Sequence, residues 1–441
     1  MQKSKLKSLV DSFIKKTSKF CVLGFALCAL SFRSSHAAEV YLGLQAYGGT
    51  GKALGVGIAP FASPSSDSES ASMAGTIRSV MREDILFTRL FSVTEGGPLV
   101  GDKLDSMAWS GLGAQVVVTG TVKADGPDVH LECRIYDVSS GKILWGKEGT
   151  GPKLNARRLA HLMSDQITFQ LSGQPGIAHT RIAFVNNHTG KKEIYVMDYD
   201  GANVRQLTRL HSITLLPKWS PDGKWIAFNS YKAGNPDAYL MDSDGGNIQD
   251  LSNRQGLNTS PNWSPDGKTL ALTMSRGGDP ELYLIERSGR IVRRLTYSPG
   301  VDTSPSFSPN GQQIVFISDR AGTPELYVMD ITGANIQRLT YGQWVDAPAW
   351  SPRGDGIAYE RQRSQGRYDV YMIDSAGKNN HVISEAGARN ENPTWSPDGR
   401  FLAYASDRDG TGKICTMGAD GDSPHCVSAL GGESFTPSWG P

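Results

Sequence analysis

The chain has 441 residues, of which 39% are hydrophobic and 20% charged, a composition typical of a globular protein with more than one domain. Its 50 glycines and 23 prolines favour frequent turns and exclude a fold built on long helices. The formal net charge is only +1 and becomes mildly negative once a basic leader is removed, which excludes the strongly basic surface that nucleic-acid binding requires.

The leader is the N-terminal segment 1–37, which has the organisation of a secretory signal peptide; an uncleaved anchor is the alternative. Lysines are frequent in residues 3–19, an apolar run occupies 20–32, and small residues precede the expected cleavage between Ala37 and Ala38. The apolar run is shorter than the roughly 20 residues of a membrane span. Cleavage would place the mature chain in an oxidising compartment, where disulfides can form.

Residues 38–175 are predicted to form a small α/β domain that begins with a flexible N-terminal arm. Short apolar or alternating runs predict strands at 40–44, 55–61, 115–123, 129–138 and 142–146. Apolar spacing predicts helices at about 68–86, 103–110 and 155–171. Candidate N-caps of the first helix are Ser66, Asp67 and Ser68. The third helix carries one apolar stripe, formed by Leu159, Leu162, Met163, Ile167 and Leu171.

A glycine-rich segment at 46–53, AYGGTGKA, resembles a phosphate-binding loop but departs from its pattern. That loop needs Gly at its first position and Ser or Thr after the lysine, whereas Ala46 and Ala53 stand there. The segment also leads into a predicted strand, and not into a helix whose N-terminus would bind a phosphate. We therefore expect no nucleotide cofactor.

After a short linker at 172–179, the chain repeats with a period of about 44 residues, which is typical of propellers and solenoids. Each copy contains a proline, an aromatic residue and a Ser-Pro turn (the last copy is truncated), and the copies begin at Pro217, Pro261, Pro305, Pro348, Pro393 and Pro437. Three further apolar segments accompany each copy, so each repeat predicts four short strands. Six copies predict the six four-stranded blades of a β-propeller at 176–441.

Ring closure follows from the two ends of the repeat. The repeat that starts at Arg181 has no aromatic strand before it, and the chain ends with an aromatic strand at 434–439. We expect the last strand to complete the first blade, because closure removes exposed sheet edges.

The recurring residues are interpreted as structural, because a catalytic residue is not expected in every blade. The predicted packing residues are Trp219, Trp263, Trp350, Trp395 and Trp439, with Phe307 in the sixth place. The predicted turn residues are Asp222, Asp266 and Asp398.

Two cysteines flank the last hairpin. Cys415 and Cys426 are equidistant from a turn centred between Asp420 and Gly421, so they face each other across two strands. We predict a disulfide between them; two reduced thiols are the alternative. Cys133 is predicted to be a buried strand residue.

Motifs for catalysis and metal binding are missing from the sequence. It contains neither G-x-S-x-G nor H-E-x-x-H. His130 and Cys133 point to opposite faces of a predicted strand, so they cannot share a metal. The Asp-Gly hairpins at 198–201 and 242–245 lack the third acidic position of a calcium loop. We expect no catalytic residue, no cofactor and no metal site, and hence no enzyme.

The loops that lead into the inner strands differ between blades and gather around the mouth of the central channel. They are 257–261, 301–305, 345–348 and 390–393. Loops on a rigid scaffold commonly bind partners, so we expect the recognition surface here.

The order of the parts resembles the TolB family, periplasmic proteins of the Tol–Pal system. The more specific features are the arm 38-AEV-40 leading to 57-GIAPF-61, and 108-AWSGLGAQVVVTG-120. The resemblance covers essentially the whole mature chain. Residues and resemblance agree on an α+β protein, with a small N-terminal α/β domain (38–175) followed by a six-bladed β-propeller of WD40-like (PD40) repeats.

The resemblance implies a non-catalytic periplasmic interaction hub, monomeric and without nucleic acid, that supports outer-membrane invagination at cell division and envelope integrity. It implies that the propeller mouth binds Pal, an outer-membrane lipoprotein. The Pal-facing residues by position are Leu257, Asn258, Thr259, Ser260, Asp302, Thr303, Ser304, Asp346 and Asn392, with Leu257 standing where some relatives carry histidine. It implies that the arm binds TolA, an inner-membrane protein, through Glu39, Val40, Tyr41, Leu42, Gly43 and Leu44.

The alternative function is that of an exported propeller that binds a small molecule or sugar, or of a degenerate peptidase-associated propeller. Charged or aromatic clusters inside the channel mouth would favour this alternative.

Overall fold

A computed structural model describes residues 31–34, 53–64, 67–100, 103–363 and 366–441. The chain divides into two compact units, Met1–Met163 and Ser164–Pro441, and the division falls inside helix α5 (Ala156–Ser172). The predicted linker at 172–179 follows from the end of this helix. Among the described residues, no helix combines the length and the apolar character needed to cross a membrane.

The first unit contains a six-stranded sheet in the order β1-β8-β7-β6-β2-β3. Its strands are β1 (Ser31–Ser34), β2 (Leu54–Ile58), β3 (Phe91–Thr94), β6 (Val116–Asp125), β7 (Asp128–Asp137) and β8 (Ile143–Pro152). Strand β2 pairs in parallel with β3 and β6, and the other pairs are antiparallel. Strands β4 (Leu99–Val100) and β5 (Lys103–Leu104) form a separate hairpin.

Helix α3 (Ser68–Phe87) confirms the first predicted helix and packs against β6. Of the three candidate caps, Asp67 is the N-cap, since its carboxylate accepts a hydrogen bond from the Ser70 amide at 2.6 Å. The third predicted helix is also present, as a 3-10 turn, η2 (Lys153–Asn155), followed by α5. The second begins later than predicted, as α4 (Ser106–Gly111), because 103–104 belong to β5.

The side chain of Trp109, on α4, explains why a glycine stands at position 57 of β2. The indole is fully buried among Ala59, Val117 and neighbouring side chains. A Cβ on Gly57 would lie 2.6 Å from the indole ring, so the close approach requires glycine at this position of β2.

Several sequence predictions meet the limits of the described residues. The strand at 40–44, the arm Glu39–Leu44, nearly all of the glycine-rich segment and the cleavage site at Ala37 and Ala38 lie outside them. Strand β1 falls inside the predicted leader and pairs with 147–150 of β8. Strand β8 also continues beyond its predicted end to Pro152, and strand β3 was not predicted.

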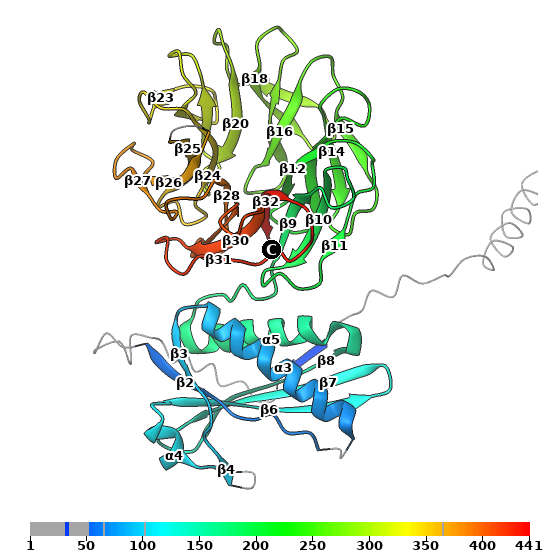
Figure 1. The fold of residues 1–441 in the computed structure, drawn as a ribbon, viewed down its shortest axis with the longest axis vertical. Coiled ribbons are helices and arrows are strands. Elements are labelled where there is room, and N and C mark those ends of the chain that lie inside the picture. The colour runs from blue at the N-terminus through cyan, green and yellow to red at the C-terminus, as the bar shows by residue number, and fades with distance from the viewer. Residues whose placement is uncertain (1–30, 35–52, 65–66, 101–102, 364–365) are drawn as a thin grey trace, which may run out of the picture. The chain divides into compact units, whose positions relative to one another are not determined.

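The second unit is a ring of six four-stranded sheets, which confirms the predicted six-bladed propeller (Figure 1). Blade 1 consists of β12 (Thr214–Trp219), β13 (Trp225–Ser230), β14 (Asp237–Asp242) and β15 (Gln249–Ser252). Blade 2 consists of β16 (Asn258–Trp263), β17 (Thr269–Met274), β18 (Glu281–Glu286) and β19 (Ile291–Arg294). Blade 3 consists of β20 (Asp302–Phe307), β21 (Gln313–Ser318), β22 (Glu325–Asp330) and β23 (Gln337–Arg338). Blade 4 consists of β24 (Val345–Trp350), β25 (Ile357–Gln362), β26 (Tyr368–Ile373) and β27 (His381–Val382). Blade 5 consists of β28 (Asn390–Trp395), β29 (Phe401–Ser406), β30 (Lys413–Gly418) and β31 (His425–Cys426). Blade 6 is β32 (Ser434–Gly440) with β9 (Arg181–Asn186), β10 (Glu193–Asp198) and β11 (Arg205–Gln206).

Blade 6 joins the two ends of the propeller, as predicted. Strand β32 pairs antiparallel with β9, with Trp439 opposite Ile182. The Trp439 indole also donates a 2.8 Å hydrogen bond to the Thr180 hydroxyl just before β9. Figure 1 shows β32 beside β9 at this closure.

The recurring aromatic residues are packing residues, as predicted. All six are between 6% and 8% exposed. The indole N–H of Trp263 donates to the Lys218 carbonyl of the preceding blade at 3.0 Å, and Trp395 repeats this contact with Ala349 at 2.9 Å. Each aromatic side chain therefore packs against a neighbouring blade as well as its own.

The recurring aspartates form turns, as predicted. In the second blade, the Ser264 hydroxyl donates to Asp266 at 2.7 Å, and the Lys268 amide donates to the same oxygen at 3.1 Å. The same serine-to-aspartate bonds occur at Asp222 and Asp398. These bonds close the turn on itself.

Strands β30 and β31 place Cys415 directly opposite Cys426, and the structure joins them in a disulfide. Cys133 is buried on β7, and burial raises the pKa of its thiol.

Candidate functional site at the propeller mouth

The six inner strands share a bulge at the end that faces the mouth. In each, the pairing shifts register just before a proline. The residue before the proline has a positive φ: Leu216 (53°), Ser260 (54°), Ser304 (51°), Ala347 (50°), Asn392 (52°) and Thr436 (40°). Such a backbone is unfavourable by about 1 kcal/mol or more for most residues, so the surrounding sheets must hold it in place.

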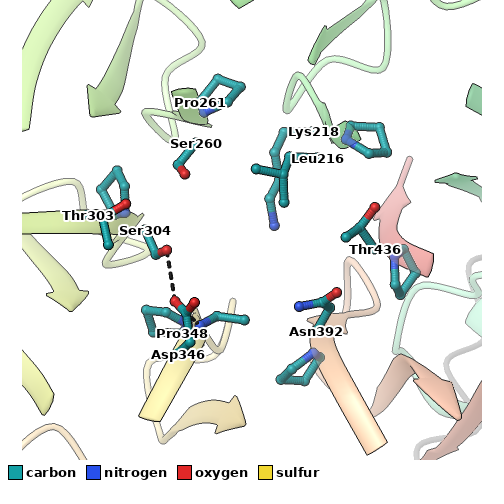
Figure 2. A pocket seen from close by; sticks show the side chains of 15 residues that line it. Leu216, Lys218, Ser260, Pro261, Thr303, Ser304, Asp346, Pro348, Asn392 and Thr436 are labelled. Atoms are coloured by element: carbon teal, nitrogen blue, oxygen red, sulfur yellow. Dashed lines mark hydrogen bonds between the residues drawn. The ribbon is translucent and has the colours of Figure 1, made fainter. Parts of the chain in front are cut away.

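These six residues line one cavity of about 240 Å³ (Figure 2). Because every blade contributes to it, the cavity lies on the propeller axis and forms the upper part of the central channel. A second cavity of about 430 Å³ is lined by the recurring aromatic residues and the prolines of the turns. Lys218 and Pro348 line both cavities, so the two meet at their level.

Two carboxyl groups face each other across strands β24 and β25 beside the upper cavity. Asp346 is the cross-strand partner of Glu360. The Asp346 carboxylate accepts hydrogen bonds from the Ser304 hydroxyl at 2.9 Å and the Ala347 amide at 2.7 Å. Glu360 accepts bonds from the amide and the side chain of Asn392, at 2.8 and 3.0 Å.

Burial and the neighbouring Asp346 carboxylate raise the pKa of Glu360 to about 8, and burial also raises the pKa of Asp346. Like charges directly opposite each other on a sheet are unfavourable. Both shifts favour protonation within the pair and oppose two negative charges at this position.

Lys218 brings the opposite charge to the channel. It lies on β12 between Pro217 and Trp219, and its side chain reaches into the cavity, across from Asp346 (Figure 2). Burial lowers the pKa of its ammonium group to about 8. Lys218 and Asp346 are the two charged side chains among the described residues that line the upper cavity.

An apolar rim borders the mouth on four neighbouring blades. It consists of the residues that immediately precede the inner strands of blades 1 to 4: Ile213, Leu257, Val301 and Trp344. Their exposed fractions are 48%, 38%, 38% and 40%. Trp344 also contacts Tyr368, with 5.6 Å between ring centroids. Arg389 and Glu433 take the equivalent positions on blades 5 and 6, so the rim has one apolar and one charged side.

The structure brings together most of the predicted Pal-facing residues. Those that line the upper cavity are Ser260, Thr303, Ser304, Asp346 and Asn392. Leu257 belongs to the apolar rim, and the Thr259 hydroxyl donates to Asn229 at 3.1 Å.

Asn258 and Asp302 do not present side chains to a partner, contrary to the prediction. Both are fully buried. Asp302 accepts hydrogen bonds from Arg320 at 2.8 and 3.1 Å. The Asn258 amide donates to Asp237 at 3.1 Å and also contacts the backbone of its own loop. Their role is to hold the loops that carry their neighbours.

Sequence reasoning missed Lys218, Glu360 and Trp344. The sequence did contain a signal for Lys218, which lies between the proline and the aromatic residue of its repeat. The other five repeats have an uncharged residue at this position: Asn262, Ser306, Ala349, Thr394 and Ser438. A glutamate directly after the apolar residues 357–359, in the second strand of blade 4, was a comparable signal.

Comparison with known proteins adds to this geometry. Residues 169–441 match the family described as TolB beta propeller domain, and residues 43–144 match the family described as TolB amino-terminal domain. A relative from Desulfosudis oleivorans, named Tol-Pal system protein TolB, is 38% identical over 128 residues, which cover 29% of this chain and 29% of the relative. A relative of the same name from Geobacter sulfurreducens is 38% identical over 162 residues, which cover 35% of this chain and 38% of the relative. The chain thus aligns with well under half of the length of either relative.

A crystal structure described as TolB from Acinetobacter baumannii has a TM-score of 0.76 and 26% sequence identity. The match covers 94% of this chain and 100% of that one, so it extends over both units. The propeller family alone matches more than half of the sequence. The chain therefore belongs to the TolB family.

Proposed function

We propose that this protein is a non-catalytic hub of the Tol–Pal system in the periplasm, and that its propeller mouth binds a Pal-like outer-membrane lipoprotein. The observation that carries the proposal is the apolar rim, which lies on four adjacent blades around a preformed cavity. The names of the relatives, Tol-Pal system protein TolB, support the choice of system.

The rim has the character of a protein-binding surface. Interface centres are rich in aromatic and aliphatic side chains that lose water on binding, and they are surrounded by polar residues. Trp344 supplies the largest such side chain, and Arg389 and Glu433 supply polar groups at the border. Of the residues assigned to the Pal face, we retain the six that line the cavity or the rim, together with Thr259.

The remaining parts of the proposal rest on the resemblance. The arm Glu39–Leu44 would bind a TolA-like inner-membrane protein after cleavage between Ala37 and Ala38. Alternation between the two partners would support outer-membrane invagination at division. The mature protein would act as a monomer, without cofactor or catalytic residue.

The test is calorimetric titration of the mature chain with the soluble domain of the Pal-like lipoprotein from the same organism. Leu257→Ala with Trp344→Ala should weaken binding at least tenfold, because both side chains lose their buried contacts. Val292→Ala is the matched control, since Val292 is 45% exposed but lies on outer strand β19. No binding by the unmodified chain, or equal effects of the rim and control variants, would contradict the proposal.

The second candidate, a propeller that binds a small molecule, is favoured by one observation. Lys218 and Asp346 place opposite charges inside the channel, where a surface that only recognises a protein needs none. Retention of a small ligand by the channel would support this candidate independently of any lipoprotein.

A further inference from the structure

The central channel contains a lysine without an ionic partner. Throughout the residues that the structure describes, no carboxylate forms an ion pair with the Lys218 ammonium group, and no hydrogen bond to its Nζ is present. The side chain points into the upper cavity and also borders the lower one (Figure 2). We propose that the channel is a binding site for a carboxylate, with the Lys218 ammonium group as its ionic partner.

Charge burial provides the first argument. An ammonium group in a confined site loses hydration, and this loss is unfavourable unless an opposite charge replaces the water. The lowered pKa of Lys218 is the same effect expressed as weaker proton binding. A negatively charged ligand in the cavity would restore the lost interaction.

Thr436 lines the same cavity. The Thr436 hydroxyl is buried and has no hydrogen-bond partner among the described residues. Thr436 belongs to blade 6, which is next to the blade that carries Lys218. A carboxylate accepts hydrogen bonds through two oxygens, and either of them can accept from the ammonium group of Lys218.

The charges around the cavity favour a single carboxylate over a phosphate or a polycarboxylate. Asp346 lines the opposite wall, and its neighbour Glu360 has a raised pKa. A single carboxylate can lie beside Lys218, whereas each further negative charge would add repulsion from Asp346. The carboxylate can come from a small organic acid or from the glutamate side chain of a polypeptide, because both present the same group.

The experiment follows the Lys218 amine by NMR in mature protein labelled with ¹⁵N-lysine, with Lys218→Met to assign the signal. Propionate should perturb this signal and raise the pKa of the amine, whereas propionamide, which has the same shape without the charge, should not. Binding should weaken by up to about tenfold per pH unit above pH 8, as the ammonium group is lost. Repetition in Glu360→Gln separates this loss from ionisation of Glu360.

Two peptide probes identify the source of the carboxylate. N-acetyl-Ala-Glu-Ala-amide should bind and its glutamine counterpart should not. Saturation by propionate assigns the site to small acids, and saturation by the glutamate peptide alone assigns it to a polypeptide side chain. Both outcomes support a carboxylate site.

Lys224→Met is the matched control, because Lys224 is in the same blade but 75% exposed, and this variant should bind like the unmodified chain. Lys218→Met should remain folded, since it removes a partly buried charge that has no ionic partner among the described residues, and thermal unfolding checks this. The inference is overturned if neither carboxylate perturbs the Lys218 amine, or if Lys218→Met binds the carboxylate as well as the unmodified chain does. The test does not involve a lipoprotein, so its failure is distinct from failure of the Pal proposal.

Discussion

The two ends of the inner strands differ in kind. At the end away from the mouth, every blade repeats a buried aromatic residue, and the first five blades follow it with a closed turn. At the mouth, each strand carries a bulge with positive φ, and the residues around it vary between blades. Repetition therefore marks the scaffold of this propeller, and departures from repetition mark its candidate binding surface.

The largest expected effect tests whether the recurring aromatic residues contribute more to stability than the residues at the mouth. Trp263→Ala should lower the free energy of unfolding by about 3–5 kcal/mol, because it leaves a cavity between two blades. Trp344→Ala at the rim should lower it by less than about 1 kcal/mol, because that side chain is 40% exposed. Chemical denaturation measures both, and equal losses would remove the distinction between the two ends.

A second effect concerns the carboxyl pair at the mouth. The pKa of Glu360 is raised on folding from its ordinary value of 4.5 to about 8. Its contribution to stability is therefore fully present below pH 4.5 and is lost as the pH rises through 8, by at most about 1.4 kcal/mol per pH unit.

Glu360→Gln should be less sensitive to pH than the unmodified chain over this range. The free energy of unfolding at pH 5 and pH 8 gives the comparison, with Glu433→Gln as an exposed control from the rim. An unchanged pH dependence in Glu360→Gln would show that the pair does not titrate as inferred.

The smallest effect tests the strained backbone of the mouth. Ala347→Gly should raise the free energy of unfolding by about 0.5–1 kcal/mol, because glycine adopts a positive φ without the Cβ clash. Ala349→Gly, two residues further on the same strand, should lower it by a similar amount, because its backbone is regular. Opposite signs in the two variants locate the strain at the bulge.

Much of the scaffold could be predicted, because a propeller repeats its packing and turn residues in every blade. Ring closure and the disulfide register followed from symmetry within the repeat and within one hairpin. The site was harder to predict, since burial depends on distant strands. Asp302 is a polar loop residue by sequence, but Arg320 in the neighbouring loop of the same blade encloses it. Glu360 reaches the mouth only because pairing places it opposite Asp346.

Blade 6 combines strands from the two ends of the propeller, and this affects the order in which the propeller can fold. Strand β9 can pair with β32 only after nearly the whole propeller sequence, which lies between these two strands, has been synthesised. Five blades can assemble from contiguous stretches of chain as they are synthesised, but the ring stays open until residues 434–440 are available. Removal of this terminal strand should therefore yield an open, aggregation-prone array, since β9 would then expose its pairing edge.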